Sequence, residues 1–97
     1  MKFVVYARYI DDAVKIEASR PAHRQYARDL AASGKLVAAG PFTDGSGALF
    51  IYDVDSREEV DALVKADPFA TSGAFARCEI KPWQLLGANP ASFQVQA

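Results

Sequence analysis

The sequence predicts an α+β fold: a ferredoxin-like βαββαβ domain with a four-stranded antiparallel sheet and two main helices on one face. Three observations lead to this prediction. The chain has 97 residues, which is enough for one domain but not for a second core. Its apolar segments follow strand-like and helix-like spacing in the order β-α-β-β-α-β. Its composition, 51% hydrophobic and 24% charged, is that of an ordinary globular domain.

The first strand is expected over Lys2–Tyr9, which is rich in Val, Phe and Tyr. A helical stretch follows over residues 11–33, with two aspartates at its start. Pro21 interrupts this stretch, and Ser19 stands two residues earlier as a possible N-cap. We therefore expect a short helical turn and then a main helix that begins at about Arg20.

Glycine and proline punctuate the next part of the chain. Gly34 is well placed to end the first helix. A short second strand is expected over Leu36–Ala39 and a third over Ala48–Val54. Residues 40–47 between them contain three glycines and a proline, which indicates a loop or a wide hairpin.

The second helix has clear signals at both ends. Ser56, with Glu59 three residues later, forms a capping box that predicts its start. Asp67-Pro68 predicts its end, because proline disfavours the helical conformation of the residue before it. A fourth strand is expected over Phe75–Leu86. The small and polar tail, Gly87–Ala97, is expected to be loose or to lie on a partner chain.

Both faces of the predicted sheet are apolar, since side chains alternate along each strand. Two helices in this topology cover only one face. Val4, Tyr6, Leu49 and Ile51 would then belong to an open apolar surface larger than soluble monomers usually expose. A second copy related by a two-fold axis is the simplest cover, so we expect a homodimer. The alternative is that these positions are tolerated surface residues.

Charge and cysteine content exclude several classes of partner and site. Eleven basic and 12 acidic residues give a net charge of −1 without a run of like charges, so we expect neither nucleic acid nor membrane as partner. RNA binding is further disfavoured because residues 45–52 lack a basic residue. The single cysteine, Cys78, rules out an internal disulfide framework and is expected to be buried and inert. A cytoplasmic protein is the default expectation.

His23 is the only histidine and one of two candidate catalytic residues. It stands at i, i+3, i+4 and i+7 with Tyr26, Ala27 and Leu30, so it falls on the apolar stripe of the first helix. A satisfied core histidine would fit this position as well as a functional one. No metal site is expected, because one histidine with scattered carboxylates lacks the usual ligand set.

Asp67 is the second candidate, because it ends the inward stripe of the second helix after Val60, Leu63 and Val64. A local turn or helix-end role would also explain an aspartate there. Both helices should pack on the same sheet face, however, so His23 and Asp67 can converge. An imidazole beside a carboxylate is a common base near neutral pH, since the carboxylate fixes the tautomer of the ring.

Several short motifs occur in a specific order. They are Arg20-Pro21-Ala22-His23, Gly34-Lys35-Leu36 followed by Ala39-Gly40-Pro41, Gly47 at the third strand, Asp67-Pro68-Phe69 with Gly73 and Phe75, and Ile80-Lys81-Pro82-Trp83. In this combination the chain resembles the YciI-like (YCII-related) family over residues 1–86, which leaves 87–97 as a tail. The resemblance implies a ferredoxin-like fold of the dimeric α+β barrel type. It also implies a His–Asp pair lining a pocket, at His23 and Asp67.

Two kinds of function follow from the residues and the resemblance. One is a small-molecule enzyme of lyase or isomerase type, with His23 moving a proton on a small cyclic or aromatic oxygenated compound and Asp67 orienting it. The family includes a dehydrochlorinase, and muconolactone isomerases share the wider fold. No cofactor is required. The expected substrate-binding residues are Tyr6, Arg20, Phe42, Phe69 and Trp83. The alternative is a non-catalytic dimeric module that binds a small metabolite or a protein partner.

Overall fold

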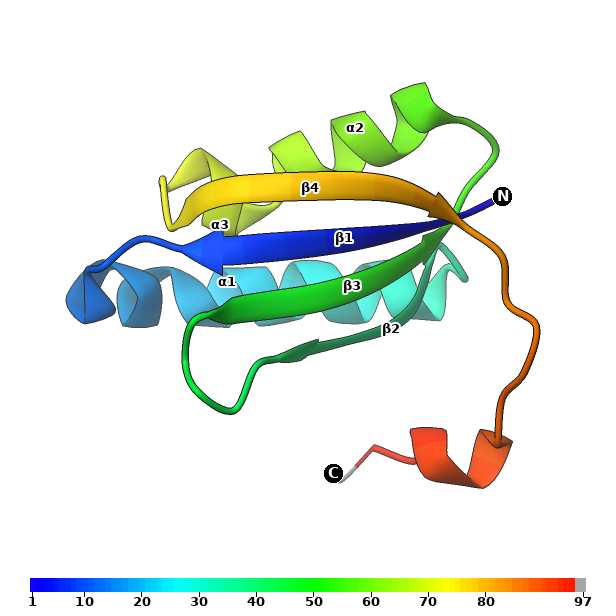
Figure 1. Ribbon diagram of the computed structural model, residues 1–97. Helices are drawn as coiled ribbons and strands as arrows, with labels where there is room; N and C mark the ends of the chain where they lie inside the picture. Colours follow the sequence, from blue (N-terminus) through cyan, green and yellow to red (C-terminus); the bar gives the residue numbers. More distant parts are fainter. Residues whose placement is uncertain (96–97) are drawn as a thin grey trace.

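The computed structural model describes residues 1–95 and confirms the βαββαβ order (Figure 1). The elements in chain order are β1 (Lys2–Tyr9), α1 (Ala13–Ala32), β2 (Leu36–Pro41), β3 (Gly47–Asp53), α2 (Arg57–Ala66), α3 (Pro68–Thr71), β4 (Phe75–Trp83) and the 3₁₀ helix η1 (Pro90–Phe93). The strands form one antiparallel sheet in the order β2-β3-β1-β4, so β2 and β4 are the outer strands. This is a ferredoxin-like α+β fold, as the sequence predicts.

Helix α1 is one continuous helix, so the predicted break at Pro21 is wrong. The helix begins at Asp12, whose Oδ1 accepts the Lys15 N–H at 3.1 Å. Ser19 does not cap a second helix: its hydroxyl donates to the Lys15 carbonyl at 3.0 Å. Pro21 has no N–H, so the Glu17 carbonyl four residues earlier lacks its usual helical donor. Both residues are exposed. Water can satisfy this carbonyl, which is why the helix continues.

The other boundaries differ from the prediction by a few residues. Gly34 ends α1 as predicted, with φ +83°, and donates its N–H to the Ala31 carbonyl at 3.1 Å. Strand β2 continues to Pro41, and β4 ends at Trp83 rather than at Leu86. These differences leave the order of the elements unchanged.

The junction between α2 and α3 positions a side chain of the site. Ser56 caps α2 as predicted, with its Oγ accepting the Glu59 N–H at 3.1 Å. Asp67 ends α2 and at the same time caps α3, a four-residue helix that is not among the elements expected from the sequence. The chain therefore turns sharply at Asp67 and brings Phe69 back toward the sheet.

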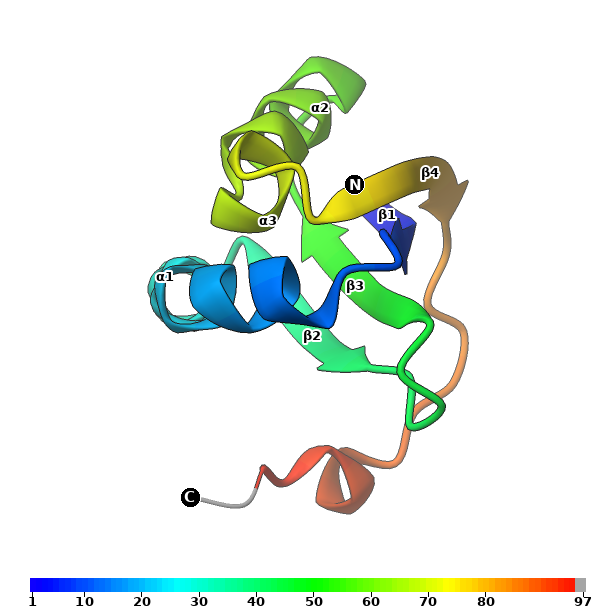
Figure 2. The same cartoon turned by 90° about the vertical axis from the view of Figure 1, so that its left-hand side faces the viewer.

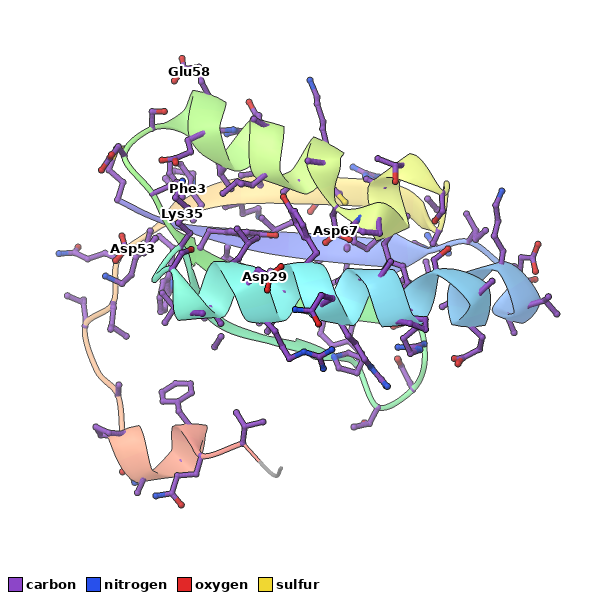
Figure 3. All side chains as sticks on the ribbon, turned by 180° about the vertical axis from the view of Figure 1, so that it is seen from behind. Phe3, Asp29, Lys35, Asp53, Glu58 and Asp67 are labelled. Atoms are coloured by element: carbon purple, nitrogen blue, oxygen red, sulfur yellow. The ribbon has the colours of Figure 1, made fainter. Side chains whose placement is uncertain are left out.

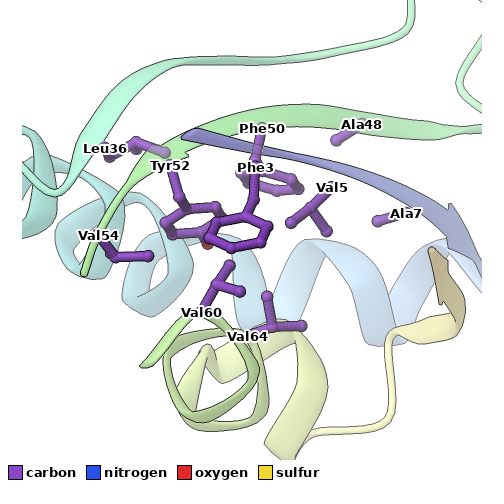
Figure 4. Close-up of a cluster of buried hydrophobic side chains, with 10 residues drawn as sticks. All are labelled: Phe3, Val5, Ala7, Leu36, Ala48, Phe50, Tyr52, Val54, Val60 and Val64. Carbon is purple, nitrogen blue, oxygen red and sulfur yellow. The ribbon is translucent and has the colours of Figure 1, made fainter. Parts of the chain in front are cut away.

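Helices α1, α2 and α3 lie on one face of the sheet, which leaves the other face without helices (Figure 2). The main core fills the space between the two layers (Figure 4). Its buried side chains are Phe3, Val5, Ala7, Leu36, Ala48, Phe50, Tyr52, Val54, Val60 and Val64. Strand residues in this set alternate with outward-facing ones, which confirms the predicted two-sided pattern.

The open face of the sheet carries exposed apolar side chains. Tyr6 is 47% exposed, Leu49 37% and Trp83 39%. Beyond β4 the chain swings around the sheet, and η1 brings Phe93 beside β2 and β3, where it shares an apolar hollow with Leu49. The last two residues of the predicted tail, 96 and 97, lie outside the described part of the chain. None of the helices within residues 1–95 is long and apolar enough to span a bilayer.

Candidate functional site

His23 and Asp67 meet between α1 and the α2–α3 junction, where Figure 3 labels Asp67. The His23 Nδ1 lies 2.8 Å from the Asp67 Oδ1, within hydrogen-bond distance. The helices converge here partly because the Tyr26 hydroxyl of α1 donates to the Leu63 carbonyl of α2 at 2.6 Å. The His23 side chain is 12% exposed and that of Asp67 is 3% exposed. The two polar residues that interrupt the apolar stripes therefore form one pair.

One oxygen of Asp67 both caps α3 and contacts His23. Its Oδ1 accepts the Phe69 N–H at 2.9 Å, which caps α3, and it also faces the His23 Nδ1. The local role suggested by Asp67-Pro68 and the convergence with His23 are thus both present. Because the backbone of α3 holds this oxygen, the carboxylate is fixed in the orientation that the imidazole requires.

The imidazole ring is held on three sides. Phe69 stacks on it with ring centroids 3.9 Å apart and planes 8° from parallel. Phe50 meets it edge-on at 5.7 Å. An ionised carboxylate only accepts hydrogen bonds, so Nδ1 of the neutral ring carries the proton and Nε2 keeps its lone pair. No described residue forms a hydrogen bond with His23 Nε2. This nitrogen is also not one of the fully buried side-chain atoms, within the described residues, that lack a hydrogen-bond partner.

A cleft of about 350 Å³ opens beside His23, between α1 and strands β1, β2 and β3. Its described lining residues are Tyr9, Arg20, His23, Arg24, Ala27, Arg28, Ala39, Gly40, Pro41, Ala48, Phe50 and Val95. One wall is apolar and the other carries the arginines of α1. A histidine whose Nε2 can accept a proton thus lines a space large enough for a small organic molecule.

The structure brings two of the expected substrate-binding residues to the His–Asp pair. Arg20 lines the cleft, and its Cζ lies 5.8 Å from the centroid of the Phe69 ring. Phe69 is fully buried, so it supports the imidazole from behind rather than forming an open wall. Contact of either residue with a substrate stays a prediction.

The other three expected residues lie away from this cleft. Tyr6 and Trp83 are on the open face of the sheet, where Trp83 pairs with Lys2 at the far end of β1. The Phe42 ring lies 5.3 Å from that of Tyr6, at the end of the β2–β3 hairpin. Phe42 also borders a second hollow, of about 340 Å³, together with Tyr9 and Arg20. It therefore stands at the rim between the two faces.

Tyr9, Arg24 and Arg28 line the cleft but were not among the expected site residues. Only Tyr9 had a signal in the sequence that points to the site. Tyr9 continues the inward-facing positions of β1, and the arginines follow Arg20 at steps of four along α1. Tyr9 therefore shares the core side of the strand, whereas the arginines form a row on the flank of the helix, which only the packing of α1 beside β2 brings to the cleft.

The surroundings of the pair raise the pKa of three nearby groups, Tyr9, Tyr52 and Cys78. Burial raises the pKa of the Tyr9 hydroxyl, and the positive charge of Arg20 opposes that shift. Burial and the negative charge of Asp67 together raise the pKa of Tyr52 and of the Cys78 thiol. Cys78 is half-buried rather than fully buried as expected, and its inertness stays a prediction.

Residues 1–95 contain no group of three or more His, Cys, Asp or Glu side chains arranged to hold a metal ion. The pair of one imidazole and one carboxylate provides two potential ligands at most. What this arrangement can do chemically is accept a proton at Nε2, hold it on the ring and release it again.

Comparison with known proteins places this chain among relatives of similar size. It is 35% identical over 63 residues to the uncharacterized protein YjpA of Bacillus subtilis (strain 168), covering 65% of this chain and 73% of YjpA. Its structure resembles that of 5-chloro-2-hydroxyhydroquinone dehydrochlorinase from Burkholderia phenoliruptrix AC1100 in complex with 2,5-dihydroxybenzoquinone. That similarity has a TM-score of 0.77 at 26% identity over 87% of this chain and 94% of the other.

A muconolactone isomerase structure shares the fold as well, with a TM-score of 0.68 at 18% identity over 99% of this chain and 98% of the isomerase. At that identity the likeness concerns the fold alone. The sequence itself matches the YCII-related domain over residues 1–84, which includes every strand of the sheet and both members of the His–Asp pair. The chain therefore belongs to the YCII-related domain family.

Proposed function

We propose that this protein is a small-molecule enzyme of lyase or isomerase type in which His23 transfers a proton and Asp67 orients the imidazole. The observation that carries the proposal is the 2.8 Å contact between His23 Nδ1 and Asp67 Oδ1, which leaves Nε2 as the free ring nitrogen of a histidine that lines the cleft. The dehydrochlorinase with the same fold and 26% identity supports this reaction class.

The proposed reaction begins when Nε2 takes a proton from a carbon or hydroxyl group of an oxygenated ring. The imidazolium that forms is stabilised by the Asp67 carboxylate at Nδ1. An isomerase returns the proton to another atom of the same molecule, whereas a lyase releases a leaving group as the electrons shift. The residues of this chain supply the proton acceptor, its orientation and the apolar walls.

A screen of lactones, chlorinated phenols and hydroxyquinones, each with and without a carboxylate group, tests the proposal. The wild-type protein should convert at least one class, and His23→Ala should lower the rate by roughly 10²- to 10⁴-fold. Circular dichroism and the unfolding transition of the variant should match those of the wild type. A His23→Ala protein that unfolds would favour a core role for the histidine, and a folded variant with full activity would contradict the proposal.

We also propose that two copies associate through the open face of the sheet. Tyr6, Leu49 and Trp83 expose between a third and a half of their surfaces there, and the partly buried Val4 and Ile51 extend the same patch. Burying these side chains against a second copy would remove apolar surface from water. The pairing leaves the cleft of each chain accessible, because the cleft lies on the helix side of the sheet.

A further inference from the structure

Three arginines of α1, Arg20, Arg24 and Arg28, line the cleft that contains His23. They stand four residues apart, so they follow one another along the same side of the helix. The described residues of the cleft lining include no aspartate or glutamate. This is a local excess of positive charge in a chain whose net charge is −1.

The partners of these arginines differ. Arg20 donates from Nε to the Glu17 carboxylate at 3.0 Å, so part of its charge is already neutralised. Arg28 donates only to the neutral Gln25 amide, at 3.3 Å. Arg24 makes no ion pair or side-chain hydrogen bond with any residue that the structure describes. Two guanidinium groups are thus available to an anion in the cleft.

The remainder of the cleft limits what that anion can be. Opposite the arginines lie small and aromatic side chains, among them Ala39, Pro41 and Phe50. A hydrated inorganic ion gains little from such a wall, whereas a flat organic body buries apolar surface against it. Guanidinium groups bind planar carboxylates through two parallel hydrogen bonds.

We propose that Arg24 and Arg28 bind the carboxylate of an organic acid whose ring or chain lies against the apolar wall, with its reacting atom at His23. This inference rests on the proposed function, since it names the substrate class of the same site. Arg20, held by Glu17 and stacked near Phe69, stabilises the side of the cleft next to the imidazole. The substrate class is therefore a small carboxylic acid rather than a neutral compound.

Binding can be measured without turnover, because the protein has one histidine and its imidazole resonances are unambiguous in NMR spectra. Benzoate and the neutral benzamide serve as a matched pair of probes, with inorganic phosphate as an anion that lacks an apolar body. Benzoate should shift the His23 signals at a concentration about tenfold or more below that of benzamide. High salt should weaken the binding of benzoate but not that of benzamide.

Variants locate the carboxylate. Arg24→Gln and Arg28→Gln should each weaken benzoate binding about tenfold, and Arg24→Lys should recover part of the loss because it restores the charge without the bidentate geometry. Arg57→Gln, on α2 and paired with Asp61, is the matched control and should bind like the wild type.

Equal affinity for benzoate and benzamide, equal affinity for phosphate, no shift with benzoate, or unchanged binding in Arg24→Gln and Arg28→Gln would overturn this assignment. Arginine-dependent binding in a protein that converts none of the screened compounds would support the carboxylate site and count against the proposed catalysis alone. Conversion of neutral compounds without any dependence on Arg24 or Arg28 would do the reverse.

Discussion

The two faces of the sheet come from the same strands, yet they have different environments. On the helix side, Val5 of β1 is 1% exposed and Phe50 of β3 is 3% exposed. On the other side, the adjacent residues Tyr6 and Leu49 are 47% and 37% exposed. The helices of one chain complete only the first face. This domain therefore has one face organised around a cleft and another that is exposed to solvent in the single chain.

The largest expected effect is on turnover and concerns the face of the sheet that the helices cover. Asp67→Asn should lower turnover roughly 10²- to 10⁴-fold, because a neutral amide no longer stabilises the imidazolium and can favour the wrong tautomer. Asparagine still accepts the Phe69 N–H as an N-cap, so the fold should be retained. Steady-state rates and thermal unfolding, measured on the same preparation, separate the two effects. Full activity in a folded Asp67→Asn variant would remove Asp67 from the mechanism.

Association through the open face is the next test. Leu49→Asp places a charge in the exposed apolar patch and should convert a dimer into a monomer, because the carboxylate would be buried without a partner. Analytical ultracentrifugation should give about twice the 10.5 kDa chain mass for the wild type and the single-chain mass for the variant. Val14→Asp, at an apolar position on α1 that is 81% exposed, is the matched control and should remain dimeric. A monomeric wild type at micromolar concentration would contradict the pairing.

Two neighbouring valines give a smaller but more direct comparison. Val5→Ala should lower the free energy of unfolding by about 2–3 kcal/mol, because it removes buried methyl groups and leaves a cavity. Val4→Ala, on the open face, should cost less than about 1 kcal/mol at protein concentrations where the chain is monomeric. Urea unfolding of the two variants measures both values. Equal losses would mean that the two faces contribute equally to the core.

The smallest expected effect is the reactivity of Cys78. Burial and the Asp67 charge raise the pKa of this thiol, so less thiolate is present at a given pH than in an unfolded chain. Labelling by a thiol reagent should be slow at neutral pH and should accelerate as the pH rises toward the raised pKa. The urea-unfolded protein is the control and should react rapidly at neutral pH. Equally fast labelling of the native protein would contradict this interpretation.

Much of this architecture could be predicted because local signals and periodicity agreed. The helical spacing around His23 and Asp67 placed both on inward stripes, and the structure joins them at 2.8 Å. The predicted helix break at Pro21 is wrong, because proline lies on the exposed side of the helix. The hydrogen bond that is lost there costs little free energy. Helix α3 was missed because four residues are too few for a periodic pattern.

The walls of the site were harder to predict than its centre. Tyr6 and Trp83 are aromatic and close in sequence to the motifs, but strand alternation puts them on the side opposite His23. Arg24 and Arg28 carry no motif, and only the packing of α1 beside β2 brings them to one cleft. Proximity of this kind depends on tertiary structure, so residue type and spacing alone do not specify it.

The outer strands also limit edge-to-edge pairing of the sheet with other copies of the chain. Each contains a proline, Pro41 in β2 and Pro82 in β4, and β2 is further interrupted by an irregularity between Leu36 and Ala38. Proline offers no N–H to an added strand, and a bulged border twists away from one. If chains were added edge to edge, the β-ladder between them would lack a hydrogen bond at the proline of each outer strand. The outer strands of the sheet thus disfavour fibril-like growth, which is consistent with the proposed association through the open face.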